Sequence, residues 1–323
     1  MTAQENIAVV GCGVIGLTTA ICLVKAGYKL VIVSRDALAD TTSAVAAALW
    51  YPYHAEPKDK VAVWAQTTLS RYREEQSIAE AGIQWQDFSE YLNPEAAIPW
   101  WHETVDGFRW EEKLCDLPFG MRRICYYSVP VVDTSFYLKY LEKELLDLGV
   151  QFVKADLSSI DDAFEFGKTV VNCSGIGAIQ LVGDNDLHPA RGQAVRIKKK
   201  PGHRGVVDLT REPKIAHVFP RISDTIIGGT YEENKFALEP DEIETWAIIE
   251  RCKSVLIELG DVPDEDILSV SCGLRPVRSS VRVESEAHAL GKLFHNYGHG
   301  GAGFTLSWGC AEEIVELVRA AGA

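Results

Sequence analysis

Basic residues are scarce in this sequence, and their scarcity excludes several classes of function. The chain contains 32 lysines and arginines against 46 aspartates and glutamates, which gives a formal net charge of −14. Binding to nucleic acid or to an anionic membrane surface draws on an excess of Lys and Arg. We therefore expect no nucleic-acid and no membrane partner, although an anionic small molecule needs only a local basic pocket.

Cysteine patterns that bind metals are also lacking. The eight cysteines are scattered, none forms a CxxC pair, and no Cys/His cluster has the spacing of a zinc site. Scattered cysteines with apolar neighbours are typical of buried thiols in a reducing compartment. The sequence predicts no metal site and no disulfide framework.

Hydrophobic runs of membrane-spanning length are represented by a single stretch, residues 7–24. Gln4 and Glu5 precede it where a signal peptide would carry positive charge, and no small-residue cleavage site follows. Three glycines interrupt the stretch, so a buried strand followed by a buried helix accounts for it better. The last residues, Ala-Ala-Gly-Ala, differ from the peroxisomal Ser-Lys-Leu signal. We expect a cytoplasmic protein.

The sequence does contain α/β patterning over 323 residues, a length that favours roughly two domains. A strand–helix–strand unit opens the chain, whereas residues 50–110 carry six of the eight tryptophans and lack this rhythm. The pattern predicts strands at 7–10, 30–33 and 169–173, helices at 17–24, 133–148 and 240–259, and a last helix after the glycine-rich residues 297–303. Because α/β patterning returns after the interruption, we expect two domains, each assembled from separate stretches.

Residues 11–16 read Gly-Cys-Gly-Val-Ile-Gly and lie between the first predicted strand and the first predicted helix. In this context Gly11 allows a tight turn, Gly13 lets the backbone approach a pyrophosphate, and Gly16 lets the helix pack closely on the strand. The helix N-terminus then offers free N–H groups to the phosphates. The segment predicts dinucleotide binding.

The position that commonly holds an acidic residue for the adenosine ribose is Ser34 here, and Arg35 follows it. One interpretation is an NADP protein in which Arg35 faces a 2′-phosphate. The other is an FAD protein in which Arg35 lies along the adenine or the pyrophosphate.

Two further segments have the composition of a cofactor site. Residues 40–50 place hydroxyl side chains before a run of alanines and a tryptophan, and small residues let the backbone come close to a flat ring or a phosphate. Residues 298–303 contain four glycines and open a helix, which offers backbone N–H groups to a polar ring edge.

Taken together, these segments resemble the D-amino acid oxidase family, FAD flavoproteins that also include D-aspartate oxidase. The resemblance covers nearly the whole chain and rests on GCGVIG, TTSAVAAALWYPY, VVNCSGIG, ARGQ, IIGGTY, GLRPVR and HNYGHGGAGFTLSWGCA. It implies an α/β fold in which a Rossmann-type FAD-binding domain (residues 1–50, 134–190 and 270–323) is interleaved with a mixed-sheet substrate-binding domain (residues 51–133 and 191–269). It also favours the interpretation in which Arg35 binds FAD over the one in which Arg35 faces the 2′-phosphate of NADP.

The resemblance further implies non-covalent FAD, since no Cys or His is marked out for attachment. The residues that it implies for FAD binding are Gly11, Gly13, Val14, Ile15, Gly16, Arg35, Thr42, Ser43, Ala47, Ala48, Leu49, Leu157, Gly300, Gly301, Gly303 and Thr305.

For catalysis, the resemblance points to Arg275, Tyr231, His217 and Gly301. Arg275 matches the arginine that grips the substrate carboxylate, a bidentate role that suits a guanidinium fork. Tyr231 matches an active-site tyrosine of yeast-type members, whereas His217 stands where mammalian members have a tyrosine. The loop before it, residues 210–215, looks short for a lid, and at low pH a charged His217 could pair with a second carboxylate.

The function implied is FAD-dependent oxidative deamination of D-amino acids with neutral side chains. Hydride transfer from Cα to flavin N5 would lead to a 2-oxo acid, ammonia and hydrogen peroxide, with dioxygen as the second substrate; a homodimer is left open. A D-aspartate oxidase is the alternative and would need extra cations, for which Arg211, His217 and Arg221 are candidates. An NADP-dependent dehydrogenase rests on Arg35 alone, and a non-catalytic dinucleotide sensor would have no reason to combine Arg275 with Tyr231.

Overall fold

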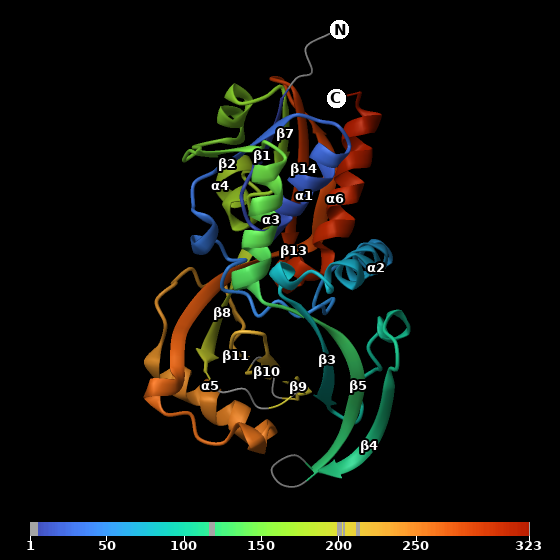
Figure 1. The fold of residues 1–323 in the computed structure, drawn as a ribbon, viewed down its shortest axis with the longest axis vertical. Coiled ribbons are helices and arrows are strands. Elements are labelled where there is room, and N and C mark those ends of the chain that lie inside the picture. The colour runs from blue at the N-terminus through green and yellow to red at the C-terminus, as the bar shows by residue number, and fades with distance from the viewer. Residues whose placement is uncertain (1–5, 116–119, 199–201, 203, 211–213, 323) are drawn as a thin grey trace.

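The structure is a computed structural model that describes residues 6–115, 120–198, 202, 204–210 and 214–322. In these ranges the strands form one large mixed sheet, with helices packed on it (Figure 1). The strands are β1 (Ile7–Val10), β2 (Leu30–Ser34), β3 (Ile83–Leu92), β4 (Arg109–Cys115), β5 (Gly120–Val132), β6 (Gln151–Lys154), β7 (Thr169–Asn172), β8 (His188–Ile197), β9 (Arg204–Asp208), β10 (Ala216–Pro220), β11 (Thr225–Gly228), β12 (Glu232–Glu233), β13 (Ile267–Ala287) and β14 (Lys292–His299). The helices are α1 (Val14–Lys25), α2 (Lys58–Glu75), α3 (Thr134–Asp147), α4 (Ala178–Val182), α5 (Glu242–Val255) and α6 (Gly303–Ala320).

One half of the sheet is parallel, in the order β14-β7-β1-β2-β6. Its short strands are almost wholly apolar because both of their faces are covered. Ile7 and Val9 of β1 face the core that includes α1, α3 and α6, whereas Ala8 and Val10 face the segment around Ile160. Figure 1 shows this half above, with the carboxyl ends of its strands directed toward the other half.

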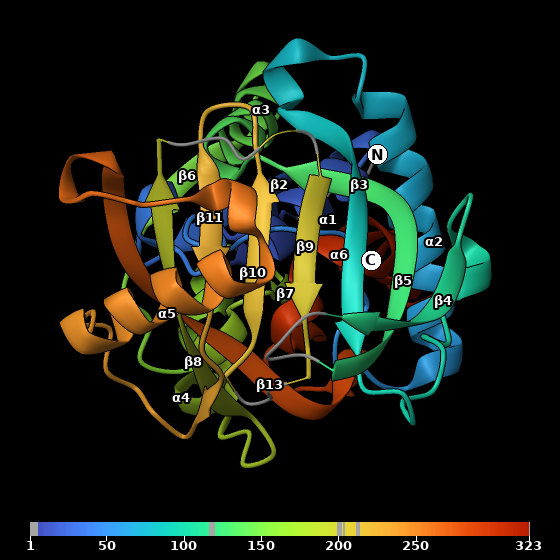
Figure 2. The same cartoon turned by 90° about the horizontal axis from the view of Figure 1, so that it is seen from below.

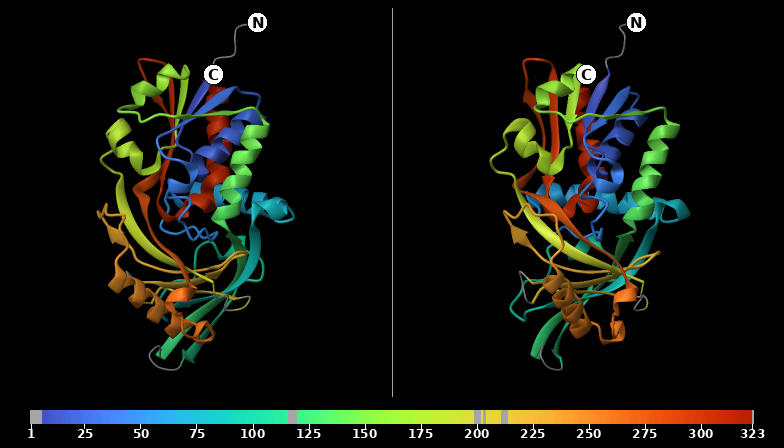
Figure 3. Two further views of the ribbon diagram at one scale, coloured as in Figure 1. Left: turned by 60° about the vertical axis from the view of Figure 1, so that its left-hand side comes forward. Right: turned by 90° about the vertical axis from the view of Figure 1, so that its left-hand side faces the viewer.

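The other half of the sheet, in the order β4-β5-β3-β9-β10-β11-β8, is mostly antiparallel. Alternation along β10 turns Ala216 and Val218 toward α5, while His217 and Phe219 point to the opposite face. Figure 2 shows α5 lying across these strands, and Figure 3 shows it on the outside of the curved sheet. The inner face is therefore free to line a cavity.

The long strand β13 joins the two halves. Its first part pairs with β8 and its last part with β14, with a register shift between Val277 and Arg282. The α/β class with a mixed sheet, predicted above, is confirmed. The division of the chain into two domains stays a prediction; α2, which lies in the segment assigned to the substrate domain, packs against α6, with the Trp64 indole donating to Glu313 at 2.6 Å.

The predicted elements near the site are present in the structure. The apolar stretch at residues 7–24 forms β1, a turn and the helix α1. Asp133 caps α3 by accepting a hydrogen bond from the Ser135 amide at 3.2 Å, and Asp241 caps α5 in the same way through Glu244. Within the described ranges, we find no helix that is long and apolar enough to cross a membrane.

Candidate active site

A cavity of about 760 Å³ lies between the carboxyl ends of the parallel strands and the inner face of the antiparallel half. Its volume is in the range of small-molecule and cofactor sites. Of the residues predicted for the site, those that line the cavity are Gly11, Gly13, Val14, Ile15, Arg35, Thr42, Ser43, Ala47, Ala48, Leu49, Leu157, His217, Arg275, Gly300, Gly301 and Gly303. Residues from four distant parts of the sequence therefore meet in one space.

The turn between β1 and α1 is packed so tightly that its glycines are needed sterically. Gly11 has φ +109°, and a Cβ there would lie 2.6 Å from the Cys173 carbonyl oxygen. A Cβ on Gly16 would lie 1.9 Å from the Gly11 carbonyl oxygen. Gly16 itself is not part of the cavity wall, so its role is the close packing of helix on strand.

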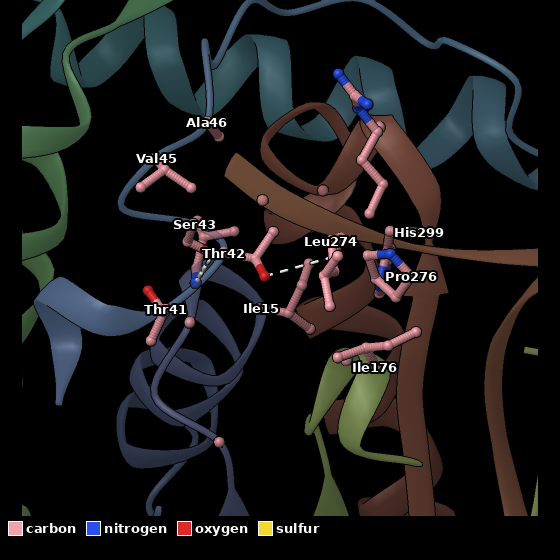
Figure 4. Close-up of a pocket in the computed structure, with 18 of the residues that line it drawn as sticks. Ile15, Thr41, Thr42, Ser43, Val45, Ala46, Ile176, Leu274, Pro276 and His299 are labelled. Atoms are coloured by element: carbon pink, nitrogen blue, oxygen red, sulfur yellow. Dashed lines mark hydrogen bonds between the residues drawn. The ribbon is translucent and has the colours of Figure 1, made fainter. Parts of the chain in front are cut away.

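The segment 41–49 crosses the cavity next to this turn (Figure 4). The Ser43 hydroxyl accepts a hydrogen bond from the Val14 amide at 3.0 Å, and the Thr42 hydroxyl donates to the Leu274 carbonyl at 3.4 Å, drawn as a dashed line in Figure 4. These bonds fix the segment against α1 on one side and β13 on the other. The small side chains that follow leave the cavity open beside them.

Thr305, also predicted for the cofactor, lies behind the cavity wall. Its hydroxyl accepts from the Tyr51 amide at 2.9 Å and donates to the Tyr51 carbonyl at 3.0 Å. Thr305 thus ties the end of the 41–49 segment to the first turn of α6. The adjacent glycines 300, 301 and 303 form part of the wall.

Arg35 and Asp36 form a bidentate pair at one end of the cavity. The guanidinium Nε and Nη2 donate to the two carboxylate oxygens at 2.9 and 2.8 Å. The hydrogen bond from Arg35 lowers the pKa of Asp36. A 2′-phosphate placed against Arg35 would therefore meet a carboxylate as well, which disfavours the NADP interpretation.

Arg275 presents a guanidinium to the middle of the cavity from β13. It lies over Gly192 of β8, where a Cβ would be 2.3 Å from Nη1, and Nη1 donates to the Thr230 carbonyl at 3.1 Å. Burial lowers the pKa of Arg275, and in the described chain no carboxylate pairs with it. A cation held away from water without a counter-ion is costly unless an anion occupies the site.

Three aromatic rings surround this guanidinium. The Tyr231 ring lies 5.7 Å from the Arg275 guanidinium carbon, and Tyr53 and His54 each lie 6.2 Å from the Tyr231 ring. Tyr231 supports Arg275 but is not part of the cavity wall itself, whereas Tyr53 is. Sequence reasoning did not single out Tyr53, although the Tyr-Pro-Tyr-His run after the alanines is a signal for it.

His217 is buried in the cavity wall, with 7% of its surface exposed. Its ring stacks on Phe219 at 4.5 Å, and a Cβ on Gly228 would lie 2.4 Å from its Nε2. Nε2 has no hydrogen-bond partner among the described residues. Burial, with Arg275 and Arg251 adding repulsion, lowers the pKa of His217 to about 3. The imidazole is therefore neutral at pH 6, and the suggestion that it pairs with a second carboxylate near that pH is not supported.

His299 is a second histidine of the same kind, which sequence reasoning quoted within a motif but assigned no role. Only 3% of its surface is exposed, its Nε2 lacks a partner in the described chain, and burial lowers its pKa to about 3. It lies on the cavity wall beside Pro276 (Figure 4). A neutral nitrogen without a partner here can bind a polar ligand group.

Of the other cations considered for an acidic substrate, Arg221 does not line the cavity. Arg221 is buried and binds Asp224 through two hydrogen bonds of 2.7 and 2.9 Å. Arg211 lies outside the described residues, as does the middle of the 210–215 loop, so the length of a lid is not tested here.

Comparison with known proteins identifies the family. The family model described as "FAD dependent oxidoreductase" (DAO) matches residues 6–317. A D-amino-acid oxidase from Rubrobacter xylanophilus is 40% identical, over 97% of this chain and 95% of that protein, and one from Dictyostelium discoideum is 36% identical, over 97% and 91%. The human D-aspartate oxidase is 30% identical, over 97% and 94%. The chain belongs to the DAO family of FAD-dependent oxidoreductases.

Solved structures show that the DAO-family fold extends over the whole chain. The glycine oxidase from Bacillus cereus matches with a TM-score of 0.78, covering 98% of both chains at 19% identity. At that identity the match concerns the fold alone.

The cavity fits the cofactor of the DAO family. Gly11, Cys12 and Gly13 all line it, and Gly13 has no side chain that would come between the backbone and a ligand; a Cβ there would lie only 3.0 Å from the Ser43 hydroxyl. At the other end, residues 300–303 offer the N-terminus of α6, and the unpartnered Nε2 of His299 lies beside them. These two ends suit the phosphates and the ring system of FAD.

Proposed function

We propose that this chain is a D-amino acid oxidase that favours neutral side chains. It converts a D-amino acid, dioxygen and water into a 2-oxo acid, ammonia and hydrogen peroxide, the water hydrolysing the imino acid that oxidation leaves. One observation carries the proposal: the Arg275 guanidinium, without a counter-ion in the described chain, faces the same cavity as the glycine turn at residues 11–16. The curated relatives that carry the name D-amino-acid oxidase support it.

Arg275 binds the substrate carboxylate and sets its orientation. The bond from Nη1 to Thr230 fixes the plane of the guanidinium, and Gly192 leaves room for it. A planar guanidinium held in this way donates two parallel hydrogen bonds to a carboxylate. Tyr231 packs beside the fork, and its hydroxyl is the proposed second contact to the substrate.

Gly301 and His217 complete the reacting end of the site. Gly301 lies next to Arg275 and Tyr53, and a Cβ there would be 3.1 Å from the Tyr53 ring. Bound FAD supplies a flavin N5 that accepts a hydride from the substrate Cα. The neutral His217 offers a hydrogen bond to the substrate without adding charge.

FAD is held without a covalent bond. The proposed contacts are those named above for residues 11–16, 35, 42–49, 157 and 300–305. Three thiols line the cavity, and burial raises the pKa of each: Cys12, Cys272 and, to about 12, Cys173. Such thiols remain protonated and are poor nucleophiles toward a flavin.

The D-aspartate oxidase alternative rests on the human relative and needs cations at the side-chain end of the cavity. His217 is neutral and Arg221 is neutralised by Asp224, so neutral substrates are favoured. We also propose a cytoplasmic location, since six of the eight cysteines are buried and all are free. A homodimeric state stays a prediction.

The experiment that tests this function is a coupled assay for hydrogen peroxide and ammonia with matched D- and L-amino acids. We expect equal release of both products from D-alanine, D-valine and D-methionine and none from the L-enantiomers. Free FAD in the filtrate after denaturation shows the non-covalent cofactor. Equal turnover of both enantiomers, or flavin that stays with the denatured chain, would contradict the respective proposal.

A further inference from the structure

A glutamate that the proposed reaction does not use is buried on the cavity face of the antiparallel half. Glu90 of β3 is directly paired with Val207 of β9, and Val207 is directly paired with His217 of β10. Directly paired residues on neighbouring strands point to the same face, and strands lie about 4.8 Å apart. Val207 and His217 both line the cavity. Glu90 therefore lies on the same face, two strands beyond His217.

Among the described residues, two phenols and no cation affect the carboxyl of Glu90. None of its surface is exposed, and its Oε1 accepts a hydrogen bond of 2.6 Å from the Tyr51 hydroxyl. Its Oε2 and the Tyr127 hydroxyl are both buried, and neither has a hydrogen-bond partner among the described residues. The Glu90 carboxyl and the Tyr127 phenol nevertheless shift the pKa of each other. No cation contributes to the pKa of Glu90, which burial raises to about 7.

Tyr51, the partner of Glu90, is part of the cavity wall. Its main chain is fixed by Thr305, and its ring contacts Trp101 edge-on, with ring centres 5.1 Å apart. The hydrogen bond to Glu90 fixes the remaining free end of the side chain. The Tyr53 amide donates to the Tyr51 carbonyl at 2.8 Å, so the same segment also carries the ring beside Arg275.

We propose that Glu90 is a positioning residue that sets the side-chain end of the substrate cavity by holding the Tyr51 phenol in its wall. This inference rests on the proposed function, because it concerns substrate selection in the same cavity. Val207 of β9 and Phe219 of β10 line the cavity together with Tyr51. We expect the side chain of a long apolar D-amino acid to reach this wall and the methyl group of D-alanine not to reach it.

The titration of Glu90 gives the proposal a second consequence. Tyr51 and Tyr127 face the carboxyl from the loop and from β5, and Cys125 of β5 is its direct neighbour across the strands. None of these groups supplies a positive charge. Below pH 7 the carboxyl of Glu90 is neutral. Above pH 7 it is a buried anion that faces the Tyr51 phenol in the cavity wall.

The test uses the holoenzyme and three variants, with a matched control. E90Q keeps an acceptor for the Tyr51 hydroxyl and removes the charge, whereas E90L and Y51F remove the hydrogen bond. E111L is the control, because Glu111 accepts a bond of 2.8 Å from the Tyr126 hydroxyl on the solvent-exposed side of the sheet. Loss of a hydrogen bond of ordinary strength, about 1 kcal/mol, corresponds to roughly fivefold.

We expect E90L and Y51F to raise the KM for D-methionine about fivefold more than the KM for D-alanine, with little separate effect on kcat. E90Q should restore the wild-type ratio, and E111L should keep it. For the wild type, the plot of log kcat/KM for D-methionine against pH should change slope near pH 7, and this bend should be absent in E90Q. Equal changes for both substrates, or a bend that persists in E90Q, would overturn the proposal.

A binding measurement separates this proposal from the proposed function. The tryptophan fluorescence of the protein, compared with that of W101F to isolate the signal of Trp101 beside Tyr51, is used to follow the binding of hexanoate and propanoate without turnover. E90L should weaken hexanoate about fivefold more than propanoate. If the wild type oxidises no D-amino acid, the function fails and this ratio still decides the role of Glu90; an unchanged ratio overturns that role.

Discussion

At the scale of residues, the proposed binding of the substrate depends on a single guanidinium. Arg275 is held by a carbonyl, a glycine and aromatic rings, and no described carboxylate neutralises it. The cost of keeping this charge away from water is offset when a substrate carboxylate binds. Its neighbour His217, by contrast, is neutral, because burial lowers the pKa of its imidazole to about 3.

Replacing Arg275 tests its role directly. Truncating one partner of a desolvated charged pair costs about 2–5 kcal/mol, and 1.4 kcal/mol is a factor of ten. R275A should therefore raise the KM for D-alanine at least about tenfold, with normal FAD content. R278A is the control, since Arg278 on the same strand binds Asp184 away from the cavity. A wild-type KM in R275A would show that Arg275 does not hold the carboxylate.

The neutral state of His217 predicts a substrate preference that does not change with pH. Its pKa is about 3 in the folded protein against 6.5 in the unfolded chain, so its stabilising contribution is present above pH 6.5 and is lost as the pH falls through 3. Between pH 8 and pH 6 no imidazolium forms in the site. In E90Q, where Glu90 cannot titrate, the ratio of kcat/KM for D-aspartate to that for D-methionine should stay low at both values. Preference for D-aspartate at both would establish the D-aspartate oxidase alternative, and a rise at pH 6 would contradict the neutral His217.

Sequence reasoning found the residues that belong to motifs and missed those defined by position in space. Arg275 and His217 stand at recognisable places in GLRPVR and before IIGGTY, and both line the cavity. Glu90 belongs to no motif, and its place on the cavity face depends on the pairing of β3 with β9, strands more than 100 residues apart. Such a contact follows from tertiary packing, which local patterns do not encode.

The turn from β1 into α1 shows how an element positions the cofactor end of the site. The glycine pattern predicted this turn, and the structure explains each glycine by a contact that a side chain would break. The sequence also gave sufficient signals for α1, α3 and α5 through periodicity and caps. It gave none for the pairing of β13 with both β8 and β14, because a strand's partners depend on the whole sheet.

Two glycine-to-alanine variants should distinguish the effect of tight packing at this turn from the effect of backbone strain. In G16A the new Cβ would lie 1.9 Å from a backbone oxygen, so α1 must move away from β1. Overpacking typically costs about 1–3 kcal/mol, and the displacement also opens the phosphate site. We expect a lower Tm and a reduced flavin-to-protein ratio. G27A, at φ +97° with open space, should lower only the Tm. Full FAD occupancy in G16A would contradict this account of the turn.

At the scale of the whole molecule, one buried acid makes stability depend on pH. The pKa of Glu90 is raised from 4.5 to about 7 in the folded protein, so its stabilising contribution is fully present below pH 4.5 and is lost as the pH rises through 7. A shift of this size corresponds to roughly 3 kcal/mol. E90Q should therefore be more stable than the wild type at pH 8 by thermal unfolding, and the two should be closely matched at pH 5. An equal difference at both values would show that Glu90 does not titrate in this range.

The two halves of the sheet meet at one cavity, and the proposed cofactor contacts lie on the side of the parallel strands. A D-amino acid held by Arg275 in this cavity would give up a hydride to bound FAD. The most direct test is the absorbance spectrum of the purified protein, recorded without oxygen before and after adding D-alanine or L-alanine. We predict a flavin spectrum that D-alanine bleaches and L-alanine does not, with colour and hydrogen peroxide appearing when air is admitted. A colourless protein, or a flavin spectrum that no D-amino acid bleaches, would contradict the account.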